Sequence, residues 1–144
     1  MTYFMAGFLI STVWKLTVRP SNATLVRATL RTQPVSVARI TYAELAASIA
    51  RAWRLDAITV AQRDAILARL AADFAHMNIV EIRAALVALV PDLVMRHPLR
   101  GYDAVQLAAA LTVRTSGMAV EFWSSDVGLC QAAATEGLRV VNPN

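Results

Sequence analysis

The chain has 144 residues, of which 57% are hydrophobic and only 7% aromatic. Alanine accounts for the gap, because 27 residues are Ala. An apolar chain with five Gly, five Pro and a single Cys excludes disordered, collagen-like and disulfide-stapled proteins. Its length is that of one domain, and we predict a single domain over residues 1–144.

Charge is divided unevenly along the chain, whose net charge is +4. All ten acidic residues lie at or after Glu44, so the residues before it carry basic side chains only. This excess is compatible with a nucleic-acid partner, and equally with an Arg-rich composition. No uncharged apolar run reaches the roughly 20 residues that span a membrane, and no basic segment precedes the first apolar run. We therefore expect a cytoplasmic protein without a membrane partner.

Apolar runs alternate with helical periodicity along the chain. In chain order, strands are predicted at residues 2–9, 34–40, 78–82, 119–123 and 138–141. Helices are predicted at residues 13–32 with a break near 20–22, 42–55, 60–76, 83–96 with an interruption at Pro91, 102–114 and 127–136. Thr59 is predicted to cap the third of these helices, and Thr41 with Glu44 to form a capping box. The alternation predicts an α/β fold with a mostly parallel sheet of about five strands.

Two acids lie near the carboxyl ends of predicted strands, where open α/β sheets place their sites. Asp126 follows strand 119–123, although Asp at this position is also a favoured helix N-cap. Glu44 follows strand 34–40, although it is also placed to bond back to Thr41.

A third acid, Asp103, begins the apolar helix 102–114 on the face of Leu107 and Leu111. A carboxylate there needs a cation, a metal or hydrogen-bond donors, unless the helix dipole alone stabilises it. If the three acids converge, their repulsion favours a shared Mg²⁺ or Mn²⁺ and hydrolysis at phosphorus. Zinc-ligand spacing, a P-loop, a dinucleotide fingerprint and a serine-nucleophile elbow are absent from the sequence. The acids expected to be plain surface charges are Asp56, Asp64, Asp73 and Glu136.

Three segments carry a family resemblance: ITYAELAASIARA, RHPLRGYDAVQLAAAL and VEFWSSDVGLCQAAATEGLRVVNP. In order and spacing they resemble the PIN domain, and more narrowly the VapC-type ribonuclease toxins of type II toxin–antitoxin systems, over residues 34–144. The resemblance implies a three-layer α/β/α fold and an RNA endonuclease that depends on Mg²⁺ or Mn²⁺. It also implies a cognate antitoxin and a homodimer. By motif position, Glu44, Asp103 and Asp126 would be the catalytic, metal-binding acids.

The same resemblance makes Ser124 and Ser125 candidate substrate contacts, because the family often has small hydroxyl residues there. Arg100 is a candidate phosphate contact by its loop position and charge alone, and a solvated Arg is the alternative. The family's first strand ends in an Asp followed by Ser or Thr, whereas here Ile10 takes the corresponding place. The missing acid leaves open a catalytically inactive PIN-like protein that binds antitoxin or RNA. A further alternative is an unrelated small α/β interaction domain in which the three acids serve as caps and surface charges.

Overall fold

The computed structural model describes residues 1–6, 28–29 and 31–143. Five strands form one sheet in the order β3-β2-β1-β4-β5, and every neighbouring pair is parallel. The strands are β1 (Thr2–Met5), β2 (Val35–Ala38), β3 (Asn78–Val80), β4 (Val120–Trp123) and β5 (Arg139–Val141). The helices are α3 (Ile40–Arg54), α4 (Val60–Phe74), α5 (Ala84–Val87), α6 (Val90–Arg96), α7 (Gly101–Thr115) and α8 (Val127–Thr135). The predicted α/β fold with a five-stranded parallel sheet is confirmed.

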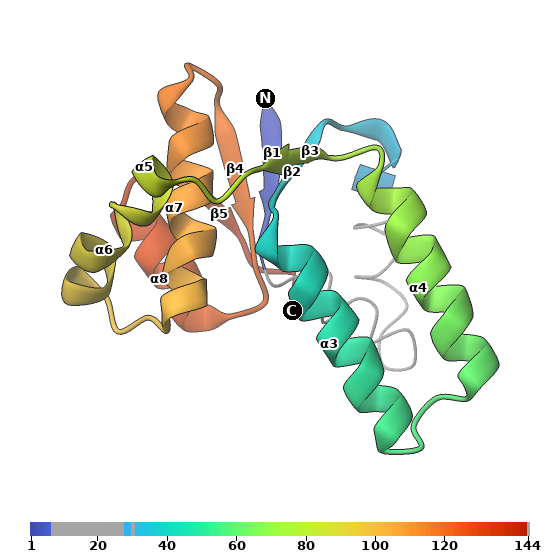
Figure 1. Cartoon of the computed structure of the whole chain (residues 1–144). Coiled ribbons are helices and arrows are strands. Elements are labelled where there is room, and N and C mark those ends of the chain that lie inside the picture. Colours follow the sequence, from blue (N-terminus) through green and yellow to red (C-terminus); the bar gives the residue numbers. More distant parts are fainter. Residues whose placement is uncertain (7–27, 30, 144) are drawn as a thin grey trace.

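The sheet is covered by helices on both faces (Figure 1). Successive strand side chains point to opposite faces, so Phe4 and Phe122 pack with α5 to α8 in one core. Met5 and Trp123 pack on the opposite face with α3 and α4 in a second core. The Phe4 and Phe122 rings stack with centroids 5.8 Å apart. The two cores fix the registers of β1 and β4, because a slip of one residue would exchange their faces.

The helix boundaries differ from the predictions where local signals compete with tertiary contacts. Thr59 caps α4 as predicted, in a capping box with Gln62. The predicted helix 83–96 is divided into α5 and α6, because Pro91 lies in the first turn of α6 and cannot continue the preceding helix. Of the predicted elements at residues 2–9 and 13–32, residues 7–9, 13–27 and 30 lie outside the described residues. In the part of the chain that is described, no helix is long and apolar enough to cross a membrane.

Candidate functional site

All five strands end at the same edge of the sheet, because all run parallel. The central strand β1 has β2 and β4 as its neighbours. Glu44 is in the helix that follows β2, and Asp126 lies three residues after the end of β4. Asp103 lies in the first turn of α7, which packs against both β2 and β4. Asp103 is close enough to both other acids for the charges to interact: it raises the pKa of Glu44, and Asp126 raises that of Asp103.

The side chain of Glu44 in α3 is held by a side-chain amide of helix α7, and not by a group of its own helix. Gln106 Nε2 donates to Glu44 Oε2 at 2.8 Å and to Thr41 Oγ1 at 2.8 Å. Burial raises the pKa of Glu44, the hydrogen bond from Gln106 opposes this rise, and the negative charge of Asp103 adds to it.

The predicted capping box of Thr41 and Glu44 is wrong. Helix α3 begins at Ile40, Arg39 precedes it, and the helix has no side-chain cap. Thr41 is buried within the first turn, and its hydroxyl faces Gln106 instead of the backbone of its own helix. The capping box was inferred from local spacing, whereas α7 supplies a buried donor for both side chains. Glu44 is therefore free of a capping role.

Asp103 is half-buried and lies beside an exposed guanidinium. Its pKa is raised by burial first and by the charge of Asp126 second, while Arg100 lowers it. Arg100 Nη1 donates to Tyr102 Oη at 3.3 Å. This contact with Tyr102 is the main cause of a raised pKa of Arg100, and the negative charges of Asp103 and Asp126 add to the rise. Arg100 is therefore a cation at the rim of the acidic edge, although it forms no ion pair with either acid.

Asp126 is the N-cap of α8, as its alternative role predicted. Its Oδ1 accepts from the backbone N–H of Leu129 at 2.7 Å, and its own N–H donates to Ser124 Oγ at 3.1 Å. Ser124 is fully buried, so it shapes the turn that presents Asp126. Ser125, the other candidate hydroxyl, is half-buried.

The three site acids differ from most others in having no cationic partner among the described residues. Five acids form ion pairs there: Asp64, Asp73, Glu81, Glu121 and Glu136. Glu44, Asp103 and Asp126 form none within that part of the chain. In the same part, no group of three His, Cys, Asp or Glu side chains is arranged to hold one metal ion. The acids thus form a loose negative cluster rather than a closed metal cage.

The central strand brings an apolar residue to this edge. Ile10, the position at which an acid was expected, lies outside the described residues. Strand β1 ends at Met5, and Ala6 continues its ladder by donating its N–H to the carbonyl of Trp123 at 2.9 Å. Ala6 is fully buried. The residue that leaves the central strand at the acidic edge is therefore an alanine.

Neither a protein-family model nor a curated protein matches the chain. Solved structures do match it across its length. FitAcB from Neisseria gonorrhoeae is 15% identical with a TM-score of 0.64, covering 99% of this chain and 98% of that chain. VapBC-1 from nontypeable Haemophilus influenzae is 16% identical with a TM-score of 0.64 and the same coverages. VapBC2 from Rickettsia felis, bound to a promoter DNA fragment, is 11% identical with a TM-score of 0.66, covering 98% of both chains.

The chain has a PIN-like fold. The likeness extends over nearly the whole chain, whereas the sequence resemblance covers residues 34–144. It removes the alternative of an unrelated small α/β fold. At these identities it establishes the PIN-like architecture, and the chemistry of the site depends on the residues of this chain.

Gln106 was not identified from the sequence as a residue of this site, and the prediction for Glu136 was wrong. Gln106 gave one signal, its place three residues after Asp103 on the same helical face. Glu136, predicted to be a plain surface acid, has a side chain only 12% exposed. It accepts from His97 Nε2 at 2.7 Å and pairs with Arg96 at 2.8 Å. Because His97 and Glu136 are 39 residues apart, no local pattern indicates this contact.

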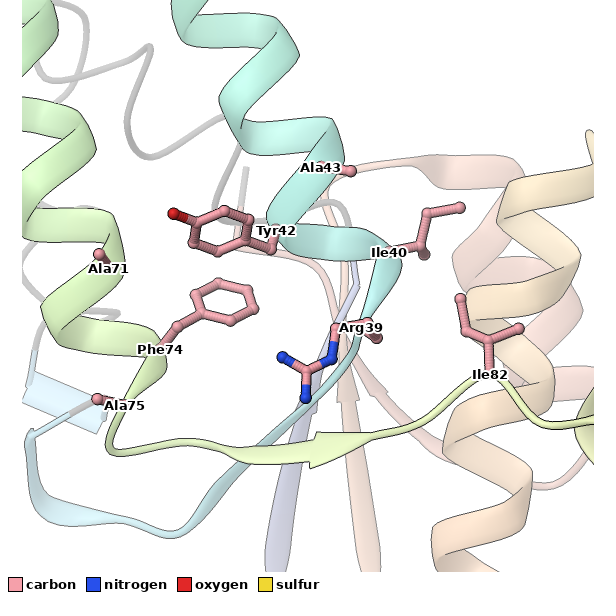
Figure 2. Close-up of a pocket in the computed structure, with 8 residues that line it drawn as sticks. All are labelled: Arg39, Ile40, Tyr42, Ala43, Ala71, Phe74, Ala75 and Ile82. Carbon is pink, nitrogen blue, oxygen red and sulfur yellow. The ribbon is translucent and has the colours of Figure 1, made fainter.

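A pocket of about 510 Å³ lies between the start of α3, the end of α4 and the segment after β3. Figure 2 shows Tyr42 and Phe74 facing each other beside Arg39. The two rings meet edge to face, with centroids 5.1 Å apart, and the Arg39 guanidinium is paired with Glu81. None of the three site acids lines this pocket. The pocket is thus distinct from the acidic edge.

Proposed function

We propose that this protein is a metal-dependent endoribonuclease of the toxin type, in which Glu44, Asp103 and Asp126 hold Mg²⁺ or Mn²⁺ and RNA phosphodiesters are hydrolysed. The observation that carries the proposal is the convergence of three carboxylates from three elements on one sheet edge. Burial raises the pKa of Glu44 and of Asp103, and the charges of Asp103 and Asp126, respectively, add to the two rises. Negative charge gathered in this way is stabilised by a bound divalent cation.

The donors of this edge suit a hard divalent cation in kind. They are carboxylate oxygens without ion-pair partners in the described residues. Near them, the buried carbonyl oxygen of Gln106 has no hydrogen bond in that part of the chain. Mg²⁺ keeps several water molecules and is commonly held by one or two carboxylates plus substrate phosphate. A loose cluster of acids therefore fits such an ion, with water completing its shell.

Each residue of the edge has a distinct role in the proposed reaction. When bound, the cation would supply a water of lowered pKa and offset the charge that develops at phosphorus. Gln106 holds Glu44 in one orientation, and the turn from Ser124 fixes Asp126. Arg100 would bind a phosphate of the RNA, because a guanidinium donates two parallel hydrogen bonds to such oxygens. Ser125 would be a second contact to RNA, through its hydroxyl.

The proposal includes a cognate antitoxin, a homodimer and a cytoplasmic location. Structures of the same fold come from a toxin–antitoxin complex of Klebsiella pneumoniae, with a TM-score of 0.62 and 18% identity, and from FitAcB and VapBC-1. The antitoxin would cover the acidic edge and exclude RNA from it. The net charge of +4 favours the approach of RNA to the free toxin.

The test is cleavage of RNA by the purified protein with Mn²⁺ or Mg²⁺, compared with Asp103→Asn. We expect metal-dependent cleavage that Asp103→Asn reduces by at least about 100-fold, as expected for loss of a group that stabilises charge in the transition state. Asp92→Asn is the matched control, because Asp92 is also a first-turn acid of its helix but lies in α6. Equal cleavage by wild type and Asp103→Asn would refute the proposal.

A second candidate is a PIN-like protein that binds antitoxin or RNA without cutting. Ala6 favours it, because the central strand brings no acid to the edge. It predicts that wild type shows no cleavage with either metal while still binding RNA in a salt-dependent manner. Cleavage by wild type that Asp103→Asn abolishes excludes it.

A further inference from the structure

Gln106 is a buried amide whose two ends have different surroundings. Its side chain lies on α7 and the residue is only 1% exposed. The nitrogen makes two hydrogen bonds at 2.8 Å, to Thr41 and to Glu44. The carbonyl oxygen Oε1 has no partner in the described part of the chain. A buried acceptor without a donor costs free energy, and native structures keep few of them.

The orientation of this amide is fixed by its neighbours. Turning it over would aim Oε1 at the ionised carboxylate of Glu44, placing acceptor against acceptor. Nε2 therefore faces Glu44, and the planar amide places Oε1 beside the same contact. Asp103 lies three residues earlier on α7, on the same helical face. The carboxylates of this edge cannot satisfy Oε1 when ionised, because they only accept.

We propose that Gln106 is a positioning residue of the acidic edge, whose amide nitrogen orients Glu44 while Oε1 accepts a hydrogen bond from the water shell of a divalent cation bound there. The inference rests on the proposed function, because it assumes that the acids bind a cation. It adds a neutral side chain that links one acid to the ion's hydration shell. Groups that orient metal ligands contribute about 10- to 100-fold to metal affinity.

The test uses the full-length protein and Mn²⁺ alone. In wild type, the side-chain amide signal of Gln106 should broaden strongly in NMR spectra as Mn²⁺ is added. The exposed amides of Gln33, which precedes β2 at the opposite edge of the sheet, and of Gln62, in the first turn of α4, should broaden much less at the same metal concentration and serve as internal controls. This measurement requires no variant to fold.

The second measurement compares Mn²⁺ binding by wild type, Gln106→Met and Gln131→Met. Met keeps the length of the side chain and removes both amide ends, and Gln131 is an exposed position on α8. We expect Gln106→Met to weaken Mn²⁺ binding by about 10- to 100-fold, and Gln131→Met to leave it unchanged.

The outcomes separate this inference from the proposed function. If wild type binds Mn²⁺ and cleaves RNA while the Gln106 signal stays sharp and Gln106→Met binds equally well, the inference is overturned and the nuclease stands. If wild type binds no Mn²⁺, the metal-dependent function and the role of Gln106 both fail. If the Gln106 signal broadens selectively and Gln106→Met loses affinity, the inference is supported.

Discussion

The carboxylate of Asp126 accepts a hydrogen bond from the backbone N–H of Leu129, with Oδ1 and N 2.7 Å apart. Asp126 thus caps α8 and contributes charge to the acidic edge. The cap engages one of its two oxygens. Gly128 keeps space for that oxygen, because a Cβ at residue 128 would lie 3.3 Å from Oδ1. Capping and charge are therefore separable by substitution.

Asp126→Asn should keep the cap and lose the charge, whereas Asp126→Ala should lose both. Since Asn caps helices about as well as Asp, we expect Asp126→Asn to unfold in urea near the wild-type midpoint. Asp126→Ala should lower the free energy of unfolding by about 1 kcal/mol. Both variants should lose RNA cleavage to the same degree. If Asp126→Asn cleaves like wild type, the charge of Asp126 has no part in the reaction.

The pKa of Asp103 predicts how stability changes with pH. Burial and the charge of Asp126 raise this pKa above its ordinary value of 3.8, so the folded chain keeps the proton at a pH where the unfolded chain has lost it. As pH rises from 3.8 through the raised pKa, the folded state loses stability relative to the unfolded state. Without metal, the melting temperature of Asp103→Asn should therefore increase relative to that of wild type as pH rises toward 7. A constant difference between the two proteins would contradict the coupling.

The pH dependence of stability that Glu136 causes has the opposite sign. The hydrogen bond from His97 is the main reason why the pKa of Glu136 lies below its ordinary value of 4.5. The contribution of Glu136 to the free energy of unfolding is fully present above pH 4.5 and is lost as pH falls through the lowered pKa. At pH 7, Glu136→Gln should cost about 1–3 kcal/mol, since it weakens a largely buried charge-assisted hydrogen bond. Asp73→Asn, which breaks an exposed i,i+4 pair with Arg69, should cost about 0.5 kcal/mol or less. Urea unfolding of both variants decides, and equal costs would show that the His97–Glu136 contact adds nothing.

Much of the fold follows from local patterns, because strands buried on both faces read as continuous apolar runs. The cap at Thr59 is local in the same way, since its partner Gln62 is three residues away. The roles of Thr41 and Glu136 were misjudged because their partners, Gln106 and His97, are 65 and 39 residues away. Position relative to the strand ends indicated Glu44 and Asp126, and the apolar face of its helix indicated Asp103. The hydrogen-bond partners of these acids depend on how the helices pack together, which the spacing of residues in the sequence does not indicate.

The end of the central strand is the place where one substitution should alter the site most. Ala6 is buried at the end of β1, between β2 and β4. Ala6→Asp would therefore add a fourth carboxylate to an edge whose three carboxylates already repel negative charge. Without metal we expect this variant to melt at a lower temperature than wild type, because a buried carboxylate lacks a cation. With Mn²⁺ its melting temperature should rise more than that of wild type, since ligand binding stabilises the folded state in proportion to RT ln(1 + [L]/Kd). A tenfold gain in affinity corresponds to about 1.4 kcal/mol. Ala6→Asn, of equal size and without charge, should show no larger Mn²⁺ effect than wild type. If Ala6→Asp and Ala6→Asn respond to Mn²⁺ alike, the end of β1 does not face the ion.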